Sequence, residues 1–231
     1  MFIDAIQQAI VLLFSLDAEV LKITLLSLRI SLTAVFLSAL IAIPLAFFIN
    51  HHRFFGKKVL ISIIHTGMAL PPVVVGLFVY IFLSRNGILG YLDILYTPTA
   101  MIIAQMVLAI PIIMGISISA LHGVEKKIKD TVISLGATKF QLAKKVIREA
   151  KYGIITAIIT SLGAALSEVG AIIIVGGNIR FHTRALTTSI VLETRRGNFA
   201  LAMALGIILI AFAFLINFVL TYVQQKKVVD E

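Results

Sequence analysis

Five apolar stretches, each long enough to cross a lipid bilayer, constrain this chain more than any other feature of its sequence. The hydrocarbon core of a bilayer is about 30 Å thick and requires roughly 20 apolar residues in an α-helix. Five such stretches in 231 residues leave too little polar sequence to cover them in a soluble protein. We therefore predict an all-α integral membrane protein with five transmembrane helices. The stretches cover about residues 30–50, 59–84, 98–121, 154–177 and 199–223.

The composition supports a membrane protein and argues against several other classes. Apolar residues make up 60% of the chain and charged residues 13%, whereas charged residues are usually about a quarter of a soluble domain. This balance argues against a disordered chain, and the lack of a short repeat argues against collagen and coiled coil. The chain has no cysteine, and its histidines show no metal-ligand spacing with carboxylates, so we expect no metal or cofactor in this chain.

The basic residues gather on one side of the predicted spans. Of the 20 lysines and arginines, 13 lie in segments 50–58 and 123–153 and in the tail at Lys226 and Lys227, which the spans place on the same side. By the positive-inside rule this side is the cytoplasm, so the N-terminus is outside and the C-terminus is in the cytoplasm. The net charge of +9 is therefore a signal of topology, and we expect no nucleic-acid partner. Residues 5–14 are too short to cross and lack the basic start of a signal peptide, so we expect an interfacial helix there.

The prolines and small residues of the spans favour a moving pathway over a passive anchor. Each mid-span proline removes a backbone hydrogen bond and bends its helix, which membranes tolerate beside other helices or a water-filled cavity. The fourth span is instead rich in small residues, with Gly163 and Ser167 spaced for close helix contact. Ordinary helix packing would explain any one of these residues, but not the whole set. The prolines inside or at the middle of spans are Pro44, Pro71, Pro72 and Pro111.

Five spans are few for a complete transport pathway. The two halves show no inverted repeat of the kind that secondary transporters carry, so we expect two copies of the chain to enclose the pathway as a homodimer. No phosphate-binding loop of the form G-x-x-x-x-G-K-[ST] occurs, so a nucleotide-driven motor must be another chain. We therefore expect a transport subunit and not an enzyme.

The segment 123–153 is the most informative of the predicted cytoplasmic segments. Its apolar residues recur at helical spacing before and after Gly136, which predicts a helix, a glycine turn and a second amphipathic helix. A solvated basic loop steadied by anionic lipid is the alternative. The apolar face favours a protein surface that covers it.

The same segment resembles the EAA motif of ABC importer permeases. Asp130, Thr131 and Val132 stand where the family has an acidic residue and two small residues, and Gly136 matches the glycine six positions beyond. Val146 matches the isoleucine of the family's Ile-x-Leu-Pro, although the Leu-Pro is absent. In the family this loop forms coupling helices that dock in a cleft of a cytoplasmic ATPase dimer, which binds ATP and Mg²⁺. The resemblance implies this role for Asp130, Thr131, Val132, Leu135, Gly136, Ala137 and Phe140.

Three other stretches resemble one group within the ABC importer permeases. ALPPVVVG at 69–76 resembles a stretch of molybdate and tungstate importer permeases, SEVGA at 167–171 resembles their Ser/Gly-Glu-Phe-Gly-Ala segment, and residues 175–194 look most like the tungstate branch. The resemblance covers about residues 21–223. It implies a type I ABC importer permease in the cell membrane, a single permease domain over 1–231 and an extracytoplasmic substrate-binding protein. It also implies tungstate as the transported oxyanion. The alternatives are a molybdate or sulfate permease, or a channel or secondary transporter that works without a motor.

Charged residues in or beside the spans are the candidates for transport chemistry. Glu168 is the one carboxylate deep in a predicted span, where an ionisable group is costly and normally faces a cavity or the bundle interior. We expect a structural or gate-region role for it, with Pro71 and Pro72 on the pathway, because a proton relay would need a partner carboxylate. Arginine forks suit oxyanions, so the outer segment is expected to attract the anion or to pair with acidic residues of the binding protein. Ordinary interfacial arginines are the alternative. The arginines of this basic mouth are Arg180, Arg184, Arg195 and Arg196.

Overall fold

The described part of the protein is built from α-helices and one short 3₁₀ turn. The computed structural model describes residues 7–12, 15, 17–124, 128, 131, 132 and 134–230. Residues 7–12 are helical, in agreement with the short helix expected there. The later elements are α2 (Ala18–His51), α3 (Lys57–Met68), α4 (Pro72–Leu83), η1 (Gly90–Leu92), α5 (Pro98–His122), α7 (Lys139–Glu149), α8 (Lys151–Ser167), α9 (Gly170–Gly176), α10 (Leu186–Arg195) and α11 (Phe199–Asp230).

Within these residues, three helices are each long and apolar enough to cross a membrane, namely α2, α5 and α11. Two further spans exist if each of two bent helix pairs counts as one. The pair α3 and α4 is bent by 101°, and the pair α8 and α9 by 60°. The five predicted spans therefore correspond to three continuous helices and two bent helix pairs.

Both breaks follow from local sequence. Pro71 and Pro72 lack the N–H groups that would continue α3, and Pro72 begins α4 at a first-turn position, where a missing N–H costs nothing. Glu168 takes an extended backbone conformation that ends α8, and α9 begins at Gly170. The sequence predicts a bend at the proline pair, but not a right-angled one, and it does not predict the second break. The helices α2 and α5 continue through their own prolines.

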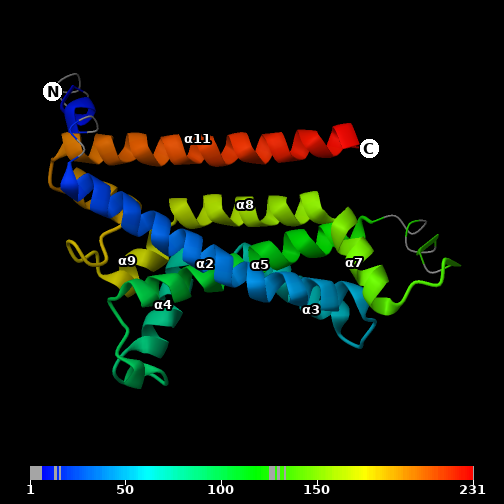
Figure 1. The fold of residues 1–231 in the computed structure, drawn as a ribbon. Helices are drawn as coiled ribbons and strands as arrows, with labels where there is room; N and C mark the ends of the chain where they lie inside the picture. The colour runs from blue at the N-terminus through cyan, green and yellow to red at the C-terminus, as the bar shows by residue number, and fades with distance from the viewer. Residues whose placement is uncertain are drawn as a thin grey trace.

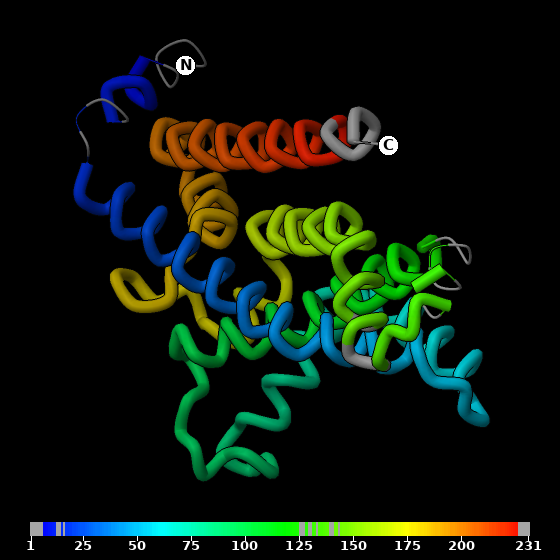
Figure 2. Tube along the Cα trace, turned by 45° about the vertical axis from the view of Figure 1, so that its right-hand side comes forward, coloured from blue at the N-terminus to red at the C-terminus, as the bar shows by residue number. Residues whose placement is uncertain are grey.

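The helices α2, α5, α8 and α11 run along the length of the molecule (Figure 1). α2 packs most extensively on α5, and α8 contacts both α5 and α11. The helix α4 and the segment 84–97 project from one side, as Figures 1 and 2 both show. The start of α2, the start of α11 and α10 lie at one end, which we call the α10 end. The opposite end holds α7 and the end of α11, and we call it the α7 end.

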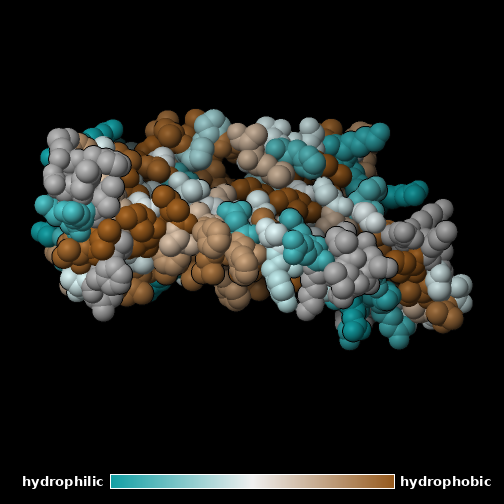
Figure 3. Space-filling model, turned by 90° about the horizontal axis from the view of Figure 1, so that it is seen from above, coloured by the Kyte–Doolittle hydropathy of each residue, from teal (hydrophilic) through white to brown (hydrophobic). Residues whose placement is uncertain are grey.

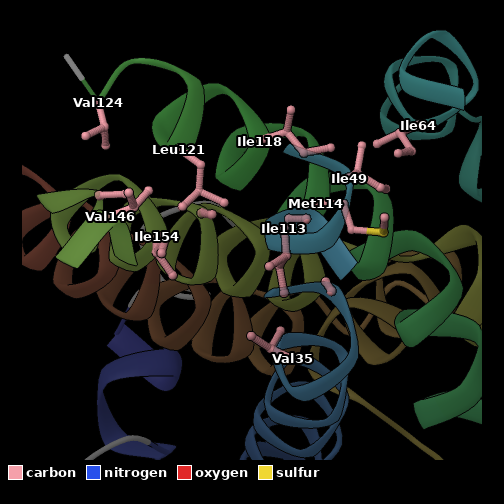
Figure 4. Close-up of a cluster of buried hydrophobic side chains, with 14 of the residues drawn as sticks. Val35, Ile49, Ile64, Ile113, Met114, Ile118, Leu121, Val124, Val146 and Ile154 are labelled. Atoms are coloured by element: carbon pink, nitrogen blue, oxygen red, sulfur yellow. The ribbon is translucent and has the colours of Figure 1, made fainter. Parts of the chain in front are cut away.

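Two apolar clusters hold the helices together. Toward the α7 end, Ile113 and Val146 belong to a cluster between α2, α3, α5, α7 and α8 (Figure 4). Toward the α10 end, Val75, Met101 and Val175 join α4, α5 and α9. In lipid such contacts stabilise through close packing, because hydrocarbon outside the protein is as apolar as the helices themselves.

The outer surface along the spans is also apolar. Phe36 on α2 is 63% exposed, and Ile210 and Phe214 on α11 are 69% and 72% exposed. The view in Figure 3 shows many hydrophobic side chains on one face of the molecule. A soluble monomer rarely exposes apolar surface on this scale. The pattern agrees with helices that face lipid.

Candidate functional site

The two breaks in the spans lie beside one cavity, which we call the central cavity. It has a volume of about 320 Å³, and its walls come from the α3–α4 break, from α5 and from α8. Pro71, Pro72 and Glu168 all line it. The structure thus brings together the three residues that the sequence predicts for the pathway, although they come from two different spans.

Glu168 ends α8 and caps α9. Its Oε1 accepts a hydrogen bond from the backbone N–H of Ala171 at 2.7 Å, and its Oε2 accepts one from Ile172 at 3.1 Å. Its carbonyl oxygen accepts a hydrogen bond from the hydroxyl of Thr187 at 2.7 Å. A carboxylate at the start of a helix satisfies N–H groups that have no partner within the helix. Glu168 therefore joins α8, α9 and Thr187 of α10 through hydrogen bonds beside the cavity.

Gln105 on α5 is a second polar residue of the central cavity, and sequence reasoning did not single it out. It is 1% exposed, and its Nε2 donates to Ser31 Oγ at 3.2 Å and to the carbonyl oxygen of Ala165 at 2.8 Å. Its Oε1 and the buried hydroxyl of Ser161, which also lines the cavity, have no hydrogen-bond partner among the described residues. A buried polar atom without a partner is costly. These two atoms make the cavity wall a place where water can bind. The sequence signal that could have indicated Gln105 is that it is a glutamine within an otherwise apolar span.

The second helices of the two bent pairs, α4 and α9, lie in very close contact. A Cβ atom on Gly76 would lie 2.6 Å from Ala171 Cα, and one on Gly170 would lie 2.5 Å from Val73 Cγ2. Glycine at both positions lets the backbones approach. The motif residues Gly76 and Gly170 are therefore packing residues at the contact between the two broken spans.

At the α10 end, the predicted basic mouth is largely an ion-pair network. Arg180 binds Glu19 through two hydrogen bonds, from Nε to Oε1 at 3.0 Å and from Nη2 to Oε2 at 2.7 Å. Arg184 is 7% exposed and lies 3.4 Å from Glu19 and 4.0 Å from Glu193. Arg196 lies 3.2 Å from Glu193. Three of the four predicted arginines thus have acidic partners within the chain. Glu19 was missed, because its local signal is only an acidic residue in the first turn of α2.

The fourth arginine of the mouth has a different environment. Arg195 is exposed and has no hydrogen bond or ion pair within the part of the chain that the structure describes. The Glu19 carboxylate raises the pKa of Arg180 through its hydrogen bond and its charge, so Arg180 remains a cation. An arriving anion must compete with a carboxylate at Arg180, Arg184 and Arg196, but not at Arg195.

At the α7 end, the predicted glycine turn and second helix are present. Gly136 has φ +76°, in the left-handed region that favours glycine. Thr138 and Gln141 form a capping box, in which Thr138 Oγ1 accepts from the Gln141 N–H at 3.3 Å and Gln141 Oε1 accepts from the Thr138 N–H at 2.8 Å. Leu135, just before the turn, is 80% exposed. Its apolar side chain is available to a partner surface.

The remaining predicted coupling residues lie around this turn. The N–H of Leu135 donates to the carbonyl oxygen of Thr131 at 3.1 Å. The N–H of Ala137 donates to the carbonyl oxygen of Val132 at 3.3 Å. Phe140 is in the first turn of α7, and Asp130 lies outside the described residues.

Part of the apolar face of this segment is covered by a protein surface of the chain itself. Val146 on α7 is 6% exposed within the cluster at the α7 end, and Leu142 packs against the same cluster. The chain itself covers this part of the helix, because α7 turns back onto α5 and α8. Leu135 at the turn remains open.

The fold and the central cavity define a class of protein. Broken membrane spans that converge on a cavity between continuous helices are a feature of transport permeases. The chain belongs to the family described as binding-protein-dependent transport system inner membrane component, which matches residues 8–229. It is therefore a multi-pass membrane subunit of an ABC importer, as its sequence motifs predict.

Individual relatives agree with this assignment. The chain is 45% identical over 201 residues to a probable anion ABC transporter permease protein of Haloferax volcanii, covering 85% of this chain and 87% of that one. It is 40% identical over 223 residues to the tungstate uptake system permease protein TupB of Peptoclostridium acidaminophilum, covering 96% and 98%. A solved structure with the same fold is that of a bacterial ABC transporter involved in the import of the acidic polysaccharide alginate. It has a TM-score of 0.71 at 20% identity and covers 95% of this chain and 82% of that one.

Proposed function

We propose that the chain is the homodimeric permease of an ATP-driven tungstate importer. The observation that carries the proposal is the convergence of two broken spans on the central cavity, because a passive anchor has no use for such breaks. The choice of tungstate rests on the similarity to TupB over nearly the whole chain.

In this proposal the breaks are the hinges of alternating access. The outer halves α4 and α9 pack on each other and meet α3 and α8 at the central cavity. Rotation about the breaks would open the cavity to one side and close it to the other. Glu168 would hold α9 in its closed position through the hydrogen bonds to Ala171 and Ile172.

The partners would act at opposite ends of the chain. A cytoplasmic ATPase dimer would dock at the α7 end, where Leu135 is exposed beside the Gly136 turn, and ATP with Mg²⁺ would bind to that dimer. An extracytoplasmic binding protein would dock at the α10 end, where Arg195 is free to meet an acidic side chain. Energetic coupling is reciprocal, so a loaded binding protein should stimulate ATP hydrolysis.

Transport in a defined system tests the proposal. Proteoliposomes would contain the permease, its ATPase and its binding protein, and the tungsten inside them would be measured by mass spectrometry. We expect uptake that requires ATP and stops when the catalytic carboxylate of the ATPase is neutralised. Uptake that persists with the inactive ATPase would contradict the proposal in favour of a channel or secondary transporter.

The identity of the anion requires a separate measurement. Calorimetry of the cognate binding protein with tungstate, molybdate and sulfate would compare the three affinities directly. We expect tungstate to bind tightest, and a clear preference for molybdate or sulfate would reassign the substrate.

A further inference from the structure

A second cavity lies at the α10 end, between the first turns of α2 and the segment that follows α9. It has a volume of about 270 Å³. Lys22 and Arg29 line it from α2, seven residues apart and so on the same face of the helix. Phe181 and Arg184 line it from the following segment, and Glu19 is its one acidic residue. We call it the α2 cavity.

The positive charge of the α2 cavity exceeds the negative charge of the described residues that line it. Both carboxylate oxygens of Glu19 already accept hydrogen bonds from Arg180, and Oε1 also receives one from Arg184. Lys22 and Arg29 have no hydrogen bond or ion pair among the described residues. Lys22 makes a cation–π contact, in which its Nζ lies 5.0 Å from the centre of the Phe181 ring.

Arg184 adds a buried donor to this cavity. The residue is 7% exposed, and its Nε has no hydrogen-bond partner in the described part of the chain. A guanidinium N–H that is buried without an acceptor is costly, and more so than a neutral donor. The cavity is thus lined by two cations without an ion pair among the described residues and by an arginine whose Nε is buried without an acceptor.

Arg29 lies in an apolar setting that makes its charge costly. Its neighbours on the exposed side of α2 are Leu25, which is 63% exposed, and Leu32, which is 51% exposed. An arginine on such a face requires water, an interface or an anion to keep its charge. An anion in the cavity would lie beside the cationic side chains of Arg29, Lys22 and Arg184, which all line it.

We propose that the α2 cavity binds a tetrahedral oxyanion. Guanidinium forks hold two oxygens of such an anion, and the ammonium of Lys22 offers three donors to a third. Two anions share this chemistry: the transported oxyanion, for which the cavity would be an entry site on the permease itself, and the phosphate of a lipid head group. The first of these identities rests on the proposed function, whereas the site itself does not.

Direct binding to the full-length chain in nanodiscs of phosphatidylcholine tests the site. The probe is tungstate in equilibrium dialysis, without a binding protein or an ATPase, and bound tungsten is counted by mass spectrometry. We expect Lys22→Gln and Arg29→Gln each to weaken binding by about tenfold, because each removes a charge-assisted hydrogen bond. Arg85→Gln is the matched control, since Arg85 is exposed in the segment after α4 and does not line the cavity. It should bind as the unchanged chain does.

A second arm identifies a lipid phosphate. The same variants are placed in nanodiscs with phosphatidylglycerol, and the retained anionic lipid is measured by native mass spectrometry. Loss of retained lipid in Lys22→Gln and Arg29→Gln but not in Arg85→Gln would support the site with lipid as its ligand. Equal tungstate binding and equal lipid retention in all variants would overturn the proposal.

The outcome for the α2 cavity is separable from that for transport. If the complete importer takes up tungstate but the variants bind tungstate and lipid like the control, the site is wrong and the transport function stands. If the variants lose tungstate or lipid binding but the complete importer takes up no tungstate, the site stands and the proposed function is wrong.

Discussion

At the residue scale, a single carboxylate connects the two halves of a broken span. Glu168 satisfies two N–H groups of α9 through its side chain, and its carbonyl oxygen binds Thr187 of α10. It is 8% exposed. A glutamine at this position has one acceptor oxygen in place of the two that Ala171 and Ile172 bind.

We expect Glu168→Gln to loosen α9. Removing one of two cap acceptors should lower the stability by about 1 kcal/mol, measured as thermal unfolding in detergent, and should raise the basal ATPase activity of the complex because the closed state is less favoured. Thr187→Val removes the other hydrogen bond and should act in the same direction. Thr194→Val is the control, since that hydroxyl bonds only to Ile190 within α10. Unchanged stability, coupling and uptake in Glu168→Gln would contradict the gate role.

At the scale of elements, the contact between α4 and α9 depends on missing side chains. We expect Gly76→Ala to destabilise the protein by about 1–3 kcal/mol, because its Cβ would overlap the backbone of Ala171 and push the two helices apart. Gly206→Ala on α11 is the matched control, with no atom within 4 Å of the added Cβ. It should keep or slightly raise the melting temperature. Equal melting temperatures for the two variants would contradict the close contact between Gly76 of α4 and Ala171 of α9.

The exposed turn before α7 leads to a prediction about coupling between the permease and the ATPase. Leu135 is 80% exposed, so Leu135→Glu should leave folding intact but weaken the binding of the ATPase by about tenfold, as expected for an apolar anchor at an interface. Ser134→Glu adds the same charge one residue earlier, also at an exposed position, and should have a much smaller effect. The measurement is co-purification with the ATPase together with ATP hydrolysis stimulated by the binding protein. Normal coupling in Leu135→Glu would exclude this side chain from the docking surface.

At the scale of the whole molecule, the absence of cysteine permits a clean test of orientation. A single thiol introduced as Arg195→Cys at the α10 end should react with a membrane-impermeant maleimide added outside intact cells, because the charge distribution predicts that this end lies outside. Gln225→Cys near the end of α11 should react only after the cells are opened. Both positions are exposed. Reversed labelling would show that the positive-inside signal fails for this chain.

Much of the architecture was predictable because it depends on local and additive properties. Apolar stretches of bilayer length predicted the spans, and the helices α2, α5 and α11 confirm three of them as continuous. The glycine turn at Gly136 and the helix after it were also predictable, because helix caps and turns are specified within a few residues. The family motifs predicted the importer permease class, which the family match over residues 8–229 confirms.

The sequence by itself therefore determined the membrane environment, most of the helices and the class of transporter, since hydropathy, turn chemistry and motifs are read within short windows. Tertiary structure decided where the spans break and what their polar groups meet. Arg180 and Glu19 are 161 positions apart, and no local pattern pairs them. The central cavity likewise depends on Gln105 of α5 lying close to Ser161 in α8 and Glu168 at its end. Packing sets such contacts, and packing is a property of the folded chain as a whole.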